Sequence, residues 1–334
     1  VNQNQDKSTS INIMQAIMIE KTGDVNVLKI KKVDDPKPKQ EEILIKQIAI
    51  GVNFFDICFR RGQYPLSQTP ACLGMEACGI VEAVGEGVTE LKIGERVAYA
   101  TGGIGAYAEK RTIHQSHVIK VPDYINDIEV AGSLFKGLVA HSLLHRVFIA
   151  LRTKRILIHS CAGGVGHILS AWAKHFELEV IGTVGDDRKI SFAKANGCDH
   201  VINYSNSDFL EEVKKITKNE GVGAVYDGVG KTTLRKSIQC LWPMGICVSF
   251  GDASGTPEPL NIDELTAKSL SLCRPLMPYY KSNRPELVLT ANEIFSSIKK
   301  KIIRPQIKTY NFSDFARAHQ ALESRASIGS IVLT

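Results

Sequence analysis

The stretch Ile156-Leu157-Ile158-His159-Ser160-Cys161-Ala162-Gly163-Gly164-Val165-Gly166 decides the fold of this chain. A short apolar run breaks into glycines, and helix-compatible sequence follows from His167 to Phe176. This order is typical of the first strand, turn and helix of a dinucleotide-binding unit, where glycines let the backbone approach a pyrophosphate. The match to G-x-G-x-x-G is imperfect because Cys161 stands where the first glycine belongs, so the interpretation depends on the flanking sequence.

Strands and helices keep alternating after the glycine turn. The pattern of apolar residues and turn residues predicts strands at 179–184, 201–204, 224–227 and 246–250, and helices at 208–218 and 232–241. This alternation indicates an α/β domain whose parallel sheet is covered by helices on both faces. The alternative is an α/β domain that binds no nucleotide. The position of the glycines directly after the first strand argues against it.

The residues before this unit have a different sequence pattern. Apolar strand-length segments at 15–20, 42–50, 79–84 and 95–99, with frequent glycines around them, predict a compact β domain with tight turns. The end of the chain predicts a helix at 293–300, a strand at 307–310, a helix at 314–323 and a strand at 330–333. A final strand can return to complete the first domain. Residues 1–13 are polar and are expected to form a flexible leader, with Met14 as an alternative start.

Composition limits the classes of protein that remain. The chain has 334 residues, of which 44% are hydrophobic, and this favours two domains with large cores. No apolar run approaches the roughly 18–20 residues needed to cross a bilayer, so we expect a cytoplasmic protein without a membrane partner. The net charge of +6 is spread along the chain. Nucleic-acid binding is not expected, because no basic stripe with interleaved aromatic residues is visible.

Metal and disulfide sites are not predicted. The 8 cysteines are scattered and form no C-x-x-C pair, which is unlike a zinc knuckle or a disulfide-rich scaffold. His141 and His145 are four residues apart on a predicted helix, but they lack the glutamate of an H-E-x-x-H motif.

Several further motifs occur in one order along the chain. They are Gly51–Asp56 (GVNFFD), Arg61–Pro65 (RGQYP), Leu73–Gly79 (LGMEACG), Lys136–Leu138, Ala162–Gly166, Val201–Tyr204, Val248–Gly251 and Leu322–Arg325. In this combination the chain, from Met14 to its end, resembles the zinc-independent quinone oxidoreductases of the medium-chain dehydrogenase/reductase superfamily, which are related to zeta-crystallin. The resemblance implies a GroES-like, β-rich catalytic domain formed by 14–136 and 274–334. A Rossmann domain with a doubly wound parallel sheet, at 137–273, would be inserted in it.

The resemblance also bears on zinc. Zinc alcohol dehydrogenases of this superfamily carry a cysteine where this chain has Asn53 and a histidine where it has Met75. An amide and a thioether do not replace the thiolate and imidazole that zinc prefers. Without a Lewis acid, the substrate must accept a hydride readily, as quinones and activated enones do.

Cofactor choice depends on the end of the second Rossmann strand. NAD enzymes place an acidic residue there, about 20 residues after the glycine motif, whereas this chain has Val184. The resemblance implies that Lys189, Tyr204 and Arg325 hold the 2′-phosphate of NADPH. Asp186 and Asp187 work against this, because carboxylates repel a phosphate. The other cofactor contacts that it implies are Lys136, Gly163, Gly164, Val165, Gly166, Phe250 and Gly251.

Asn53 and Tyr64 match polar residues that lie beside the nicotinamide in the resembled family. Their amide and hydroxyl are expected to orient a quinone oxygen for hydride transfer. The alternatives are a turn-stabilising amide for Asn53 and a packed loop aromatic for Tyr64. The chain departs from the family at Cys58, which replaces a tyrosine and widens the cleft, and at Val139, which replaces a threonine.

The resulting hypothesis is an NADPH-dependent quinone reductase. An alkenal or enone reductase on the same scaffold is the alternative within enzymes, and an NADPH-regulated RNA-binding protein is the alternative from another class. We also expect a homodimer that pairs through the strand at 269–273, because an apolar edge strand invites pairing.

Overall fold

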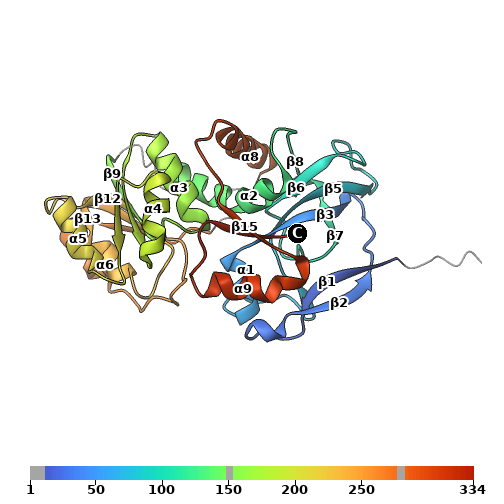
Figure 1. Ribbon diagram of the computed structural model, residues 1–334, viewed down its shortest axis with the longest axis horizontal. Coiled ribbons are helices and arrows are strands. Elements are labelled where there is room, and N and C mark those ends of the chain that lie inside the picture. The colour runs from blue at the N-terminus through green and yellow to red at the C-terminus, as the bar shows by residue number, and fades with distance from the viewer. Residues whose placement is uncertain (1–11, 148–152, 277–282) are drawn as a thin grey trace, which may run out of the picture.

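The computed structural model describes residues 12–147, 153–276 and 283–334. Figure 1 shows two lobes side by side, with helix α2 (Asp127–Ser142) between them. The expected leader lies almost wholly outside the described residues, and strand β1 begins at its last residue, Ile13. No helix within the described ranges is long and apolar enough to cross a membrane.

One lobe is built on a six-stranded parallel sheet with the order β11-β10-β9-β12-β13-β14. Its strands are β9 (Arg155–Ile158), β10 (Glu179–Val184), β11 (His200–Asn203), β12 (Val222–Asp227), β13 (Leu241–Ser249) and β14 (Ser271–Cys273). Its helices are α3 (Gly164–His175), α4 (Ile190–Ala195), α5 (Phe209–Ile216) and α6 (Leu234–Gln239). This is the doubly wound strand order, in which ligands bind at the carboxyl ends of the strands where the order reverses, here between β9 and β12.

The other lobe is β-rich. Strands follow the order β15-β16-β3-β5-β6-β8 with β7 on β3, and a smaller sheet has the order β2-β1-β4. The strands are β1 (Ile13–Ile19), β2 (Lys29–Asp34), β3 (Glu42–Val52), β4 (Ala71–Cys72), β5 (Glu76–Val84), β6 (Arg96–Tyr99), β7 (Lys110–His114), β8 (Ile119–Lys120), β15 (Ile307–Tyr310) and β16 (Ser330–Leu333). Helix α9 (Phe315–Glu323) packs on β15 and β16, α1 (Phe54–Arg61) packs on α9, and α8 (Arg284–Lys299) packs on α2. The predicted fold class is confirmed.

Some predicted boundaries were wrong. Helix α8 begins at Arg284 rather than 293, because Asn283 caps it by accepting a hydrogen bond from the Glu286 backbone N–H at 2.8 Å. Helix α6 ends at Gln239 rather than 241, because Leu241 pairs with Val222 as the first residue of β13. Helix α1 was not predicted.

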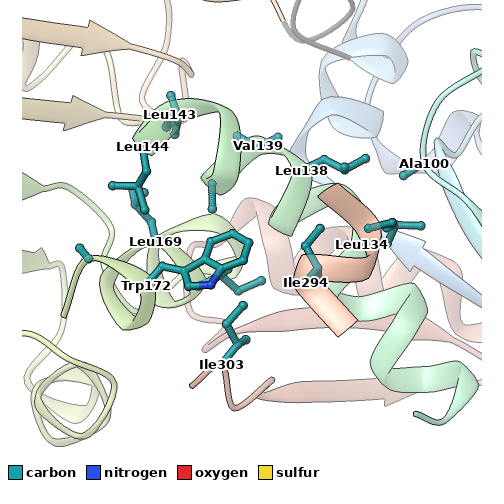
Figure 2. Packing of buried hydrophobic residues seen from close by; sticks show 14 of the residues in the cluster. Ala100, Leu134, Leu138, Val139, Leu143, Leu144, Leu169, Trp172, Ile294 and Ile303 are labelled. Atoms are coloured by element: carbon teal, nitrogen blue, oxygen red, sulfur yellow. The ribbon is translucent and has the colours of Figure 1, made fainter. Parts of the chain in front are cut away.

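A single apolar core joins the two lobes (Figure 2). Figure 2 labels Leu138 and Val139 of α2, Trp172 of α3 and Ile294 of α8, which belong to one cluster that also contains residues of both sheets. The Trp172 indole N–H donates to Ser297 Oγ at 3.0 Å, which links α3 to α8. Burial of this shared surface stabilises one arrangement of the lobes. The carboxyl ends of β9 and β12 are therefore held beside the β-rich lobe.

Candidate active site

The glycine turn lies where the sequence predicts it, between β9 and α3. Gly163 is the N-cap of α3, and Gly164, Val165 and Gly166 form its first turn. A methyl group at Gly166 would lie 2.2 Å from the Ser160 carbonyl oxygen, so only glycine allows this close approach of helix and strand. The exposed N-terminal amides of a helix favour a bound phosphate.

The C-terminal segment crosses to this turn. The Gly329 N–H donates to the Ala162 carbonyl at 2.8 Å, and Gly329 forms an isolated parallel bridge with Gly163. Gly329 has a φ of +66°, and a methyl group there would lie 2.1 Å from the Gln306 carbonyl oxygen. The residue before β16 therefore lies against the glycine turn, which the sequence did not indicate.

A buried ion pair lies next to the turn. Lys136 Nζ lies 2.6 Å from Glu76 Oε1, and their side chains are 5% and 0% exposed. The Lys136 side chain passes over Gly164, where a methyl group would lie 3.1 Å from its Cδ. Lys136 thus connects the glycine turn to the β-rich lobe, and its ammonium already has a carboxylate partner.

Asn53 belongs to the same cluster. It is the N-cap residue of α1, and its Nδ2 donates to Glu76 Oε1 at 2.9 Å. Because a carboxylate only accepts, this bond fixes which side-chain atom of Asn53 is the nitrogen. The second carboxylate oxygen, Glu76 Oε2, accepts from the Phe135 backbone N–H at 2.7 Å. Glu76 was not predicted as a site residue, although it lies within the LGMEACG motif.

Tyr64 packs in an aromatic group rather than against Asn53. Its ring centroid lies 4.6 Å from that of Phe55 and 5.7 Å from that of Phe59. Phe55 in turn lies 6.3 Å from Phe135, the neighbour of Lys136. Burial raises the pKa of the Tyr64 hydroxyl, and the Arg274 guanidinium opposes that rise. Asn53 therefore precedes α1 and Tyr64 follows it, and Phe55 of the first turn of α1 packs against the Tyr64 ring.

Arg274 is a charged residue near Tyr64 that sequence reasoning missed. It follows β14 directly and donates to Ser249 Oγ and Asp252 Oδ1, both at 2.9 Å. Its second Nη donates to the other oxygen of Asp252. The guanidinium and the carboxylate therefore form a bidentate ion pair at the ends of β13 and β14.

The predicted phosphate ligands gather beyond β10. Lys189 Nζ donates to the Arg325 carbonyl at 2.5 Å, across 136 residues of sequence. The Tyr204 hydroxyl lies beside Gly185, where a methyl group would be 3.0 Å from it. Partial burial lowers the pKa of Lys189. Lys189, Tyr204 and Arg325 thus lie beyond the carboxyl ends of β10 and β11.

The two acidic residues at this edge are both engaged. Asp186 forms an ion pair with Arg188, and hydrogen bonding to that side chain lowers the pKa of Asp186 to about 2. Asp187 accepts from Asn203 Nδ2 at 2.7 Å. The charge of Asp186 is therefore compensated locally, and Asp187 already has an amide partner.

Phe250 and Gly251 follow β13 at the same edge of the sheet. The Phe250 ring covers Gly228, where a methyl group would lie 2.9 Å from its Cζ. Gly251 lies against the Gly228 backbone. Both residues therefore stand at the carboxyl end of β12, across the strand-order reversal from the glycine turn.

Comparison with known proteins agrees with this geometry. Residues 39–123 match the family model for the alcohol dehydrogenase GroES-like domain, and 164–292 match the model for zinc-binding dehydrogenase. Quinone oxidoreductase 1 of Escherichia coli is 39% identical over 95% of this chain and 98% of its own length. The chain belongs to the quinone oxidoreductase family.

Relatives with two activities share this scaffold. The 2-haloacrylate reductase of a Burkholderia species is 40% identical over 96% of this chain and 98% of its own length. The crystal structure of the Escherichia coli quinone oxidoreductase complexed with NADPH superposes with a TM-score of 0.92 at 38% identity, covering 96% of this chain and 99% of that one.

The name of one matched family model includes zinc, so it matters which side chains of this chain could bind a metal ion. Within the described ranges no three His, Cys, Asp or Glu side chains are grouped closely enough to hold a metal. The Asn53 amide nitrogen is directed at Glu76, and His141 bonds Glu293 Oε2 at 2.8 Å. Met75, which stands where zinc dehydrogenases carry a histidine, is half-buried beside Glu76 in sequence.

His167, in the first turns of α3, predicts a pH effect on stability. Burial lowers its pKa to about 4 from an ordinary 6.5, so the unfolded chain binds a proton first as the pH falls. The contribution of His167 to the free energy of unfolding is fully present above pH 6.5 and is lost as the pH falls toward 4. The loss reaches about 2 kcal/mol at pH 5. We expect His167→Leu to remove this loss. Urea unfolding at pH 7.5 and 5 checks it, and an unchanged difference between the two pH values would contradict it.

Proposed function

We propose that this chain is an NADPH-dependent reductase that transfers a hydride to quinones. The observation that carries the proposal is Lys136, whose methylenes lie over Gly164 while its ammonium meets the Glu76–Asn53 pair. A dinucleotide whose phosphates lie on the glycine turn would therefore extend past Asn53. NADPH when bound supplies the hydride.

The residues of this chain hold the two ends of the cofactor differently. The first turn of α3 would bind the pyrophosphate through backbone N–H groups. Lys189, Tyr204 and Arg325 would hold the 2′-phosphate. The adjacent Val184 offers no carboxylate to a ribose hydroxyl, and the Asp186 charge is paired with Arg188. These contacts favour NADPH over NADH.

The substrate side combines one amide with an aromatic wall. Glu76 takes one N–H of the Asn53 amide, and the second remains to donate to a substrate oxygen that gains negative charge. Phe55, Phe59 and Tyr64 form an aromatic cluster whose rings are tilted or perpendicular to one another, and a quinone ring would pack against this apolar group. The Tyr64 hydroxyl or water would supply a proton. No metal-bound step is required, because a quinone accepts a hydride readily.

A second candidate substrate is an activated acrylate. The relationship to a 2-haloacrylate reductase and the Arg274 guanidinium near Tyr64 favour it, because a carboxylate on the substrate would meet a cation. Asp252 already neutralises that cation, which favours the neutral quinone. Rates of NADPH oxidation with 1,4-benzoquinone and with 2-chloroacrylate separate the two. Turnover of neither would refute the proposed function.

Cofactor preference is the first prediction of the proposed function. NADPH should bind well over tenfold more tightly than NADH, which corresponds to about 1.4 kcal/mol or more. Lys189→Ala should raise the Michaelis constant for NADPH with little change in turnover number. The exposed Lys194→Ala, on α4, is the matched control and should change neither. Fluorescence titration measures both affinities, and equal values for NADPH and NADH would contradict the assignment.

The substrate pocket gives a second prediction. Asn53→Ala should raise the barrier to quinone reduction by about 2–3 kcal/mol while leaving the dissociation constant of NADPH unchanged. Tyr64→Phe should have a milder effect if water delivers the proton. Steady-state kinetics and NADPH titration of each variant check this. Intact turnover with weaker NADPH binding in Asn53→Ala would place Asn53 on the cofactor side instead.

We also propose a homodimer that pairs through β14. This strand lies at the edge of the parallel sheet, and its central residue Leu272 is 38% exposed. An unpaired edge invites another strand. Light scattering should give twice the chain mass of 36.7 kDa. Leu272→Lys should give the monomer, whereas the control Ile93→Lys, at an exposed position in the other lobe, should stay dimeric.

A further inference from the structure

Behind Asn53, the β-rich lobe buries polar side chains that the proposed reaction does not use. Asp56, Arg60, Tyr107 and His319 are each at most 1% exposed. Charged side chains are rarely buried so completely unless they are paired. The four residues come from α1, from the loop before β7 and from α9, so their contacts connect segments that are distant in sequence.

Along the chain of hydrogen bonds that joins these residues, every bond has the same donor-to-acceptor direction. Arg60 Nη1 lies 3.1 Å from His319 Nδ1, and because arginine only donates, this ring nitrogen accepts. Burial lowers the pKa of His319 to about 3, so the neutral ring carries its proton on Nε2 and donates to the Tyr107 hydroxyl at 3.0 Å. The Tyr107 hydroxyl then donates to Asp56 Oδ2 at 2.9 Å.

This chain of bonds ends at the first turn of α1. Asp56 Oδ2 also accepts from the Asn53 backbone N–H at 2.8 Å. Asp56 Oδ1 has no hydrogen-bond partner among the described residues, so Oδ2 makes the contacts of this carboxylate. The Asn53 backbone is thereby held from one side by Asp56, while Glu76 holds its side chain from the other.

The opposite end reaches the predicted phosphate edge. Arg60 also forms an ion pair with Glu323, the last residue of α9, and Arg61 lies 2.8 Å from the same carboxylate oxygen. Two residues later, the Arg325 carbonyl accepts from Lys189. Helix α9 therefore contributes His319 to the chain of bonds and ends two residues before Arg325, which contacts Lys189.

We propose that Asp56 and Tyr107 are positioning residues for Asn53, and that the buried chain Arg60–His319–Tyr107–Asp56 fixes the first turn of α1 for hydride transfer. The effect on turnover rests on the proposed function. The effect on the backbone of α1 does not, because it can be measured without a substrate.

The first measurement is amide hydrogen exchange at Asn53. Tyr107→Phe removes one buried oxygen atom and with it the donor to Asp56, so exchange at Asn53 should become about tenfold faster. Tyr99→Phe is the matched control, since Tyr99 is a buried phenol of the same lobe that donates to Gln47 instead. It should leave exchange at Asn53 unchanged. Equal exchange in the wild type and Tyr107→Phe would overturn the proposal.

The second measurement is a double-mutant cycle on quinone turnover. Tyr107→Phe should lower the turnover number about tenfold without changing the dissociation constant of NADPH, and Tyr99→Phe should lower neither. If Tyr107 acts through Asn53, the effect of Tyr107→Phe disappears in the Asn53→Ala background. A turnover number within twofold of the wild type, or an equal effect in both backgrounds, would overturn the proposal.

A second pair of variants tests the same chain of hydrogen bonds in case Tyr107→Phe does not fold. His319→Leu leaves Arg60 and Tyr107 without their imidazole partner, whereas His319→Gln keeps both an acceptor and a donor. Exchange at Asn53 should be faster in His319→Leu, and His319→Gln should restore its protection. Equal exchange in these two variants would count against the chain. If the wild type reduces no quinone, the proposed function fails, and the exchange data still decide the positioning role.

Discussion

The buried carboxylate of Glu76 is the group on which the site depends. It accepts from Lys136 Nζ at 2.6 Å, Asn53 Nδ2 at 2.9 Å and the Phe135 N–H at 2.7 Å. A charge removed from water is costly unless it is paired and hydrogen-bonded, so removing one partner of such a pair is more destabilising than the pair is stabilising. This constraint holds β5, the start of α1 and the middle of α2 in one arrangement.

The same ion pair helps to fix the position of the two lobes relative to each other. Gly51 leaves room for it, because a methyl group there would lie 2.3 Å from Glu76 Oε1 and from the Ala131 carbonyl. Lys136 then carries the contact onto Gly164, the first residue of α3. The apolar core around Trp172 supports this arrangement without specifying it, since apolar burial has no direction. The polar cluster therefore decides which atoms face the crevice.

Charge compensation distinguishes the two ends of the crevice. At the proposed phosphate edge, Asp186 is paired with Arg188. Burial lowers the pKa of Lys189, and the Asp186 carboxylate opposes that fall. At the proposed substrate end, Arg274 is paired with Asp252, which partly neutralises a cation that would suit a carboxylate substrate. Relatives named as a quinone oxidoreductase and as a 2-haloacrylate reductase share this scaffold.

Local patterns in the sequence determined the alternating strands and helices, the bounds of β10 and the glycine turn, because periodicity and turn chemistry act between neighbours. A helix was predicted around His141, but the start and extent of helix α2 were not, since it is buried on most sides and shows little amphipathic period, although Asn126 and Glu129 form a capping pair at its start. Contacts across long separations were decided by the tertiary structure alone. Glu76 meets Asn53 and Lys136 across 23 and 60 residues, and Tyr107 meets His319 across 212. No local pattern encodes such meetings, because they follow from how the sheets and the returning C-terminal strands pack.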